Sequence, residues 1–197
     1  MTLPAPHTII EILDRDGLDG RRRIQSLATG AEDARALGIV LTDAEHPRVR
    51  TTAASILAAM ADPAALPALL SALFDPEPEV IAAAADAAGN SAAGHDLPEN
   101  LRRSLGERLL ALLTTPDRPR PVRTAAAYAL GLCRYAPAVT ALIATLDDED
   151  PMVRWNAVEA LSHIGGPEAA QALRQQADRE RDPEVLRYLA AALRALG

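Results

Sequence analysis

Lysine is absent from the sequence, and cysteine and aromatic residues are scarce. All 20 basic residues are Arg, which excludes mechanisms that need a Lys, such as a Schiff base or a phosphate-binding P-loop. The only cysteine is Cys133, which excludes an internal disulfide and a zinc site built on several cysteines. Aromatic residues make up 3% of the chain, too few for the core of a typical β-sandwich.

Long apolar runs and catalytic motifs are also missing. No stretch approaches the roughly 18 uninterrupted apolar residues of a membrane-spanning helix. The N-terminus has no basic segment before an apolar one, so we expect no signal peptide and a cytoplasmic protein. The four histidines are dispersed, and the sequence has no nucleophile elbow or Gly-rich phosphate loop. We therefore expect no metal site, no cofactor and no enzymatic activity.

Alanine and leucine are what the sequence has in abundance. The 197 residues include 42 Ala and 28 Leu, a mixture that favours closely packed helices. The length suits one domain or two small ones. A formal net charge of -7 argues against a general nucleic-acid binder, which needs a basic surface.

A short motif recurs five times along the chain. It consists of an acidic residue, a Pro, a Val that Arg follows in three copies, and then small apolar residues. Since Pro suits the first turn of a helix and the acid can cap it, each copy predicts a helix, a break and a second helix. No single pair of such helices can bury its apolar face alone, so the pairs must stack. The motif valines are Val49, Val80, Val122, Val153 and Val185, separated by 31, 42, 31 and 32 residues.

The pattern Asp-x-x-Pro-x-Val-Arg followed by Ala-Ala-x-x-Leu resembles the HEAT repeat, in particular the short bacterial HEAT-like repeats also found in phycobilisome chromophore lyases. Clean copies span about 43–197. The resemblance implies an all-α fold, an α-solenoid in the form of a right-handed superhelix of about five to six stacked helical hairpins. It also implies a function in binding other proteins, as in most such solenoids. Two copies depart from the pattern, with Ile81 and Leu186 at the Arg position.

The spacing predicts one repeat domain over 15–197, preceded by an N-terminal segment over 1–14. The long step contains an insertion at 89–100, predicted as a loop in which Asp96 caps a following helix over 101–113. This insertion either shapes a binding face or is a tolerated surface loop. The predicted repeats lie at about 15–43, 44–75, 76–115, 116–148 and 149–180, with a terminal half repeat at 181–197.

The Arg residues that follow the motif valine predict ion pairs at the junctions between repeats. Arg suits such a ladder because its planar guanidinium binds a carboxylate through two parallel hydrogen bonds. The alternative is that the same side chains form an anion-binding stripe. The residues of the expected ladder are Arg50, Arg123, Arg154, Asp43, Asp75, Asp148 and Asp182.

Two surfaces are candidates for binding a partner. The second helices should line a concave, mostly apolar groove that accepts a helix or an extended segment, unless tight curvature closes it. On the convex side, Trp155 with Tyr128 predicts an interaction hot spot, unless Trp155 packs across the neighbouring repeat. The predicted groove residues are Ala68, Ala72, Arg108, Leu112, Ala141, Thr145 and Gln175.

The leading hypothesis for function is a non-catalytic adaptor or scaffold that binds a protein or peptide. The resemblance to chromophore lyases leaves a second hypothesis, a protein that handles a bilin or other cofactor with Arg102, Arg103 and Arg108 facing its propionates. A third is a DNA-binding HEAT solenoid, which the net charge of -7 opposes. Self-association through the last helix, 183–196, is also left open.

Overall fold

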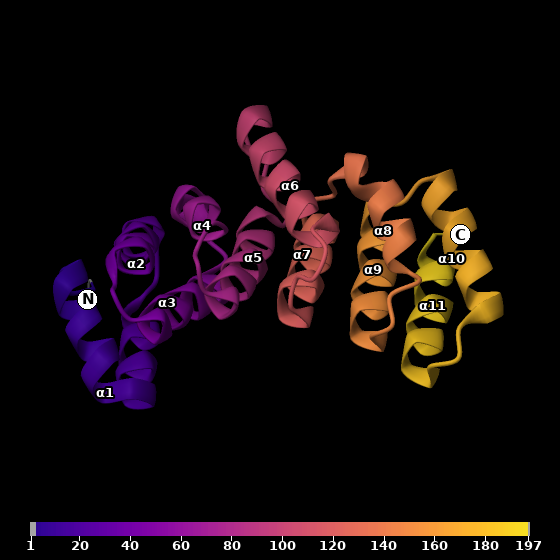
Figure 1. Cartoon of the computed structure of the whole chain (residues 1–197). Helices are drawn as coiled ribbons and strands as arrows, with labels where there is room; N and C mark the ends of the chain where they lie inside the picture. Colours follow the sequence, from indigo (N-terminus) through magenta and orange to yellow (C-terminus); the bar gives the residue numbers. More distant parts are fainter. Residues whose placement is uncertain (1–2, 197) are drawn as a thin grey trace. The chain divides into compact units, whose positions relative to one another are not determined.

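The computed structural model describes residues 3–196 and is built from helices. Over that range it contains eleven α-helices and two short 3₁₀ helices, and none of these residues lies in a strand (Figure 1). The prediction of an all-α fold is confirmed.

The chain divides into two compact units. The first ends at Asp96 and the second begins at Leu97, so the boundary falls within the predicted insertion. The helices of the first unit are α1 (Pro6–Leu27), α2 (Ala31–Asp43), α3 (Pro47–Met60), η1 (Pro63–Ala65), α4 (Leu66–Ala72) and α5 (Pro78–Ala92). Those of the second unit are α6 (Glu99–Thr114), α7 (Arg120–Leu132), η2 (Ala136–Ala138), α8 (Val139–Thr145), α9 (Pro151–Ile164), α10 (Pro167–Arg179) and α11 (Pro183–Ala195).

The repeated motif explains where every second helix begins. A Pro occupies the first turn of α3, α5, α7, α9 and α11, where its missing N–H leaves no helical hydrogen bond unmade. The motif valines that follow are all buried, with no more than 1% of any of them exposed. Each copy of the motif therefore supplies both a helix start and an anchor for the core.

Small residues let these helices approach closely. In the first unit α3 packs against α2 and α5, and in the second unit α7 packs against α6 and α9. At the crossing of α7 and α9, a β-carbon on Gly131 would lie 2.5 Å from the α-carbon of Ala160. Close-packed cores do not accommodate such overlap, so the Ala-rich and Gly-containing composition is what this packing requires.

In three repeats the residue twelve positions after the motif valine, just beyond the end of the first helix, has a positive φ. Ala61, Arg134 and Gly165 stand there, with φ values of 50°, 48° and 74°. Positive φ turns the chain out of the helix and favours glycine, but only the copy with Gly165 has a glycine at this position.

Two local predictions were wrong. Residues 89–92, expected in a loop, continue helix α5, because Ser91 and Ala92 are buried and extend its apolar face. Helix α6, predicted to begin at residue 101, begins at Glu99, and Pro98 rather than Asp96 stands at the N-cap position. Near the N-terminus, helix begins already at Pro6, and α1 contains a kink at Gly17, whose φ is 54°.

Candidate functional site

Buried ion pairs connect successive repeats, beginning with Arg50 of α3. Its Nε and Nη2 atoms donate to the two carboxylate oxygens of Asp75 at 2.7 and 2.9 Å, and only 11% and 9% of the two side chains are exposed. Its Nη1 atom donates to the carbonyls of Ala44 and Glu45. The guanidinium therefore joins the loop before α3 to the loop before α5.

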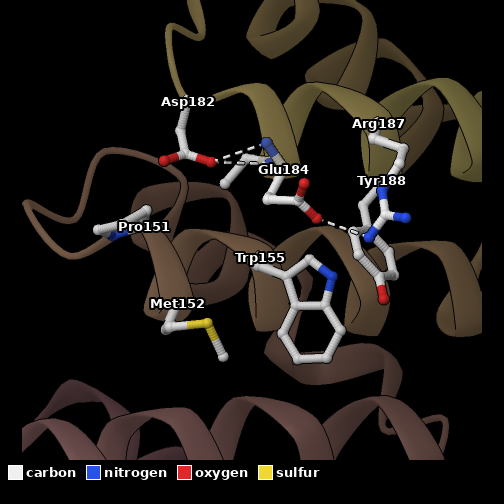
Figure 2. A pocket seen from close by; sticks show the side chains of 8 residues that line it. Pro151, Met152, Trp155, Asp182, Glu184, Arg187 and Tyr188 are labelled. Atoms are coloured by element: carbon white, nitrogen blue, oxygen red, sulfur yellow. Dashed lines mark hydrogen bonds and ion pairs between the residues drawn. The ribbon is translucent and has the colours of Figure 1, made fainter.

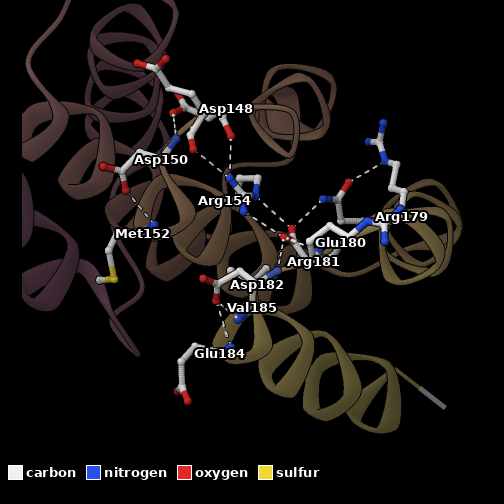
Figure 3. A network of polar contacts seen from close by, with 12 residues as sticks. Asp148, Asp150, Met152, Arg154, Arg179, Glu180, Arg181, Asp182, Glu184 and Val185 are labelled. Carbon is white, nitrogen blue, oxygen red and sulfur yellow. Dashed lines mark hydrogen bonds and ion pairs between the residues drawn. The ribbon is translucent and has the colours of Figure 1, made fainter.

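The second unit repeats this arrangement. Arg123 of α7 donates from Nη2 to Asp148 at 3.0 Å, and Arg154 of α9 donates from Nε and Nη2 to Glu180 at 2.9 and 2.8 Å (Figure 3). Arg154 also donates from Nη1 to the carbonyl of Asp148. One residue, Asp148, thus binds the Arg side chains of two successive repeats.

Glu180 is the most strongly held carboxylate of this network. Burial alone would raise its pKa, but hydrogen bonds from Arg154, Gln176 and the backbone N–H groups of Arg181 and Asp182 outweigh it and lower the pKa to about 2. Both oxygens of Glu180 accept hydrogen bonds from these internal donors. The role of Glu180 is therefore structural, and so is that of the Arg154 guanidinium, which donates to Glu180 and to the carbonyl of Asp148.

A pocket with aromatic walls lies between α9 and α11 (Figure 2). The rings of Trp155 and Tyr188 meet edge to face, with their centroids 4.8 Å apart and an interplanar angle of 78°. Met152 is beside them and 47% exposed. The pocket has a volume of about 350 Å³ and is lined by Pro151, Met152, Trp155, Asp182, Glu184, Val185, Arg187 and Tyr188.

Charged groups surround these apolar walls. The carboxylate of Asp182 caps α11 by accepting hydrogen bonds from the backbone N–H groups of Glu184 and Val185. Glu184 pairs with Arg187 at 2.6 Å, and the guanidinium of Arg187 lies 5.3 Å from the centre of the Tyr188 ring. The indole N–H of Trp155 is buried and has no hydrogen-bond partner among residues 3–196.

A second apolar area lies between α2 and α4 in the first unit. A β-carbon on Gly38 would come within 2.9 Å of the methyl group of Ala68, so the two helices nearly touch there. Beside this contact is a cavity of about 310 Å³ lined partly by Ile39, which is 46% exposed. An adjoining cavity of about 380 Å³ is lined partly by Phe74, which is 65% exposed.

The chemistry of the remaining reactive groups is limited. Among residues 3–196, no three His, Cys, Asp or Glu side chains are placed to hold a metal ion. Burial raises the pKa of Cys133 to about 12, so its thiol stays neutral and unreactive near pH 7. Over the same residues, no helix has both the length and the apolar character needed to cross a membrane.

Comparison with known proteins gives the repeats a family. The model for HEAT repeats matches residues 34–108 and 106–194. The chain belongs to the HEAT repeat family. No curated protein matches the sequence. The finer resemblance to the repeats of phycobilisome lyases stays a prediction.

Solved structures resemble the fold of this HEAT repeat chain. One is an engineered protein with 23% identity and a TM-score of 0.67, covering 98% of this chain and 99% of the other. Another is a designed armadillo repeat protein in complex with the peptide (KR)4, with 22% identity, a TM-score of 0.64 and coverage of 99% and 100%. A third, computationally designed for modular peptide recognition, has 24% identity, a TM-score of 0.60 and coverage of 98% and 100%. These likenesses show the fold, a solenoid of helical repeats.

Two acids of the predicted ladder have other roles in the HEAT repeats. The acid that binds the Arg stands five residues before a motif valine, and at that position the first copy has Ala44 and the last has Glu180. Asp182 stands three residues before its valine and caps α11. Asp43 accepts a hydrogen bond from the hydroxyl of Thr42. Placing Asp43 and Asp182 in the ladder was therefore wrong, because the sequence pattern merged two acidic positions.

The predicted groove residues are not all at the surface. Leu112 is fully buried and Ala72 is 6% exposed, so predicting them to face outward was wrong. The exposed residues are one position earlier, at Ala111 and Ser71. The others lie as follows: Ala68, Arg108, Ala141 and Thr145 are half-buried, and Gln175 is exposed.

The arginines proposed for a cofactor have partners of their own. The Nε atom of Arg102 lies 4.0 Å from a carboxylate oxygen of Glu99. The Nε atom of Arg103 lies 3.9 Å from a carboxylate oxygen of Glu107, and both pairs are within α6. Burial, with the nearby charge of Arg118, lowers the pKa of Arg108.

Trp155 and Tyr128 are both half-buried. The structure brings Trp155 into ring contact with Tyr188 of the next repeat. Tyr188, Met152 and Phe74 were missed by the sequence reasoning, although Phe74, as the single Phe of the chain, was a visible signal.

Proposed function

We propose that this protein is a non-catalytic interaction module that binds a protein or peptide segment at the pocket between α9 and α11. The observation that carries the proposal is the gathering of Trp155, Tyr188 and Met152 around one cavity of about 350 Å³. The whole chain has only five aromatic residues, and two of them meet here.

The residue types support an interface. Trp, Tyr and Met are enriched in the cores of protein interfaces, and Trp and Tyr are frequent among the residues that contribute most binding energy. Met152 is 47% exposed, so a partner that covered it would remove apolar surface from water. Burying a fully exposed side chain of this kind contributes about 1.5–3 kcal/mol, so covering the exposed part of Met152 contributes roughly half of that.

The scaffold supports the same proposal. Stacked repeats hold their surface residues in a fixed arrangement, and a preformed surface reduces the ordering cost of binding. The designed armadillo repeat protein described above holds a peptide, which illustrates what a solenoid of helical repeats can do. We also propose that the area around Ile39 and Phe74 in the first unit, and the groove predicted around Ala141, serve as further contact surfaces.

A pair of matched variants tests this proposal. Met152→Arg places a positive charge in the pocket, whereas Leu18→Arg makes a similar change at a residue that is 72% exposed and lies in the other unit. In affinity capture from the host lysate with mass-spectrometric readout, a partner held by the parent and by Leu18→Arg should be lost with Met152→Arg. Equal retention by both variants would contradict the proposed site, provided that circular dichroism shows both to be folded.

A further inference from the structure

We infer that the pocket between α9 and α11 binds a cationic side chain, Arg or Lys, presented by an extended segment of a partner protein. This inference rests on the proposed function and names the chemistry that the same pocket selects. It follows from the pocket's aromatic walls, from the carboxylates on its rim, and from the behaviour of the chain's own Arg187.

The aromatic walls suit a cation. A guanidinium or ammonium group is attracted to the electron-rich face of an aromatic ring, most strongly that of Trp. In the edge-to-face pair formed by Trp155 and Tyr188, the two ring planes are nearly perpendicular and form two walls of the cavity (Figure 2). The methylene stem of an Arg or Lys would pack along Met152 and Pro151, because such side chains bury their stems against apolar surface while the charged head stays polar.

The rim supplies complementary charge. Within the part of the chain that the structure describes, both hydrogen bonds accepted by Asp182 use its Oδ1 atom, which leaves Oδ2 for a ligand. Glu184 lies on the same side of α11 and is 71% exposed. A protein with a formal net charge of -7 also attracts a basic segment from a distance, which raises the rate of encounter.

Arg187 shows that a guanidinium fits this environment. It lies over the Tyr188 ring, with 5.3 Å to the ring centre, and at 2.6 Å from Glu184, which are the two kinds of contact that an incoming cation would make. Because 68% of Arg187 and 71% of Glu184 are exposed, their pairing contributes little stability. A partner's cation can therefore displace Arg187 and take over its carboxylate at low cost.

Fluorescence of Trp155 provides a direct measurement, since it is the only Trp of the chain. The probes are a short alternating Arg-Gly peptide with blocked ends and the same peptide with citrulline, the neutral isostere, in place of Arg. We expect the Arg peptide to change the fluorescence and to bind about tenfold tighter or more than the citrulline peptide, with calorimetry as a second readout. Its affinity should also fall as NaCl is raised. Equal affinities for the two peptides, or no binding of the Arg peptide, would overturn the inference.

Three variants separate this pocket from a general effect of charge. Glu184→Gln should weaken binding of the Arg peptide about fivefold, whereas Glu168→Gln, the same change at an exposed residue of α10, should leave it unchanged. Arg187→Gln should tighten binding severalfold, because it removes the competing cation and frees Glu184. Weaker binding by Arg187→Gln, or equal effects of the two Glu variants, would overturn the inference.

The failure of this inference is distinguishable from the failure of the proposed function. If Met152→Arg loses a partner from the lysate but the Arg peptide shows no advantage over the citrulline peptide, the interaction module stands and the selection of a cation is wrong. If the partner is retained by Met152→Arg, the pocket is not the interface, and the proposed function fails independently of the peptide measurements.

Discussion

At the scale of single residues, the turn twelve residues after the motif valine is a local source of strain. Ala61 adopts φ 50° and ψ 35° there, a left-handed conformation in which a β-carbon crowds the backbone. Ala61→Gly should therefore raise the free energy of unfolding by about 0.5–1 kcal/mol, measured by urea denaturation. Ala59→Gly, at an exposed position inside α3, is the control and should lower it by about 1 kcal/mol. A loss of stability in both variants would show that the turn is not strained.

At the scale of the helices, Glu180 connects α9 to the segment between α10 and α11. Its pKa is lowered from 4.5 to about 2 in the folded protein, so the folded state favours the ionised carboxylate. The stability that this contributes is fully present above about pH 5 and is lost as the pH falls toward 2. Glu180→Gln should be less stable than the parent by about 2–3 kcal/mol near pH 7.

When urea unfolding is repeated, this difference should be almost unchanged at about pH 5 and much smaller at about pH 3, because protonation of the unfolded state below its pKa of 4.5 removes the carboxylate's advantage in the parent. Glu168→Gln, which changes the charge of an exposed side chain on the neighbouring helix, should show almost no difference at any of the three. A gap for Glu180→Gln that stayed constant with pH would mean that lost packing, and not the ionised carboxylate, accounts for it.

The residues at which helices begin were predictable from the sequence. Which side chains the second helix of each repeat turns outward was not. Pro and Val mark each first helix, and burial of all five motif valines follows from that pattern. In α6, by contrast, Leu109, Leu110, Leu112 and Leu113 stand almost consecutively. An apolar run of this kind fits several rotations about the helix axis, so the sequence placed both Ala111 and Leu112 on the outward face, and only Ala111 is exposed.

The candidate pocket depends on contacts between repeats, which a pattern within one repeat does not contain. Trp155 stands two residues after its valine and Tyr188 three residues after its own. Their ring contact exists because α11 stacks on α9. Sequence reasoning therefore found Trp155 but paired it with Tyr128, on the preceding helix of the series, instead of Tyr188.

At the scale of the whole molecule, stability is expected to be distributed along the chain. Each repeat contacts mainly its neighbours, so a local perturbation should decay with distance along the series of repeats. The two compact units offer a test, because equivalent ion pairs occur in both: Arg50 with Asp75 in the first, and Arg123 with Asp148 in the second.

Cys133 reports on the second unit, where it directly follows α7, the helix that carries Arg123. It is the only thiol of the chain and is buried, so its labelling by a thiol reagent requires local opening. Arg123→Met should accelerate labelling about tenfold, because it leaves Asp148 without a charged partner in a partly buried site. Arg50→Met removes an equivalent pair from the first unit and should accelerate labelling much less, although circular dichroism should show that it also lowers stability. Equal acceleration by the two variants would mean that the repeats open together as one cooperative unit, and would contradict the nearest-neighbour description.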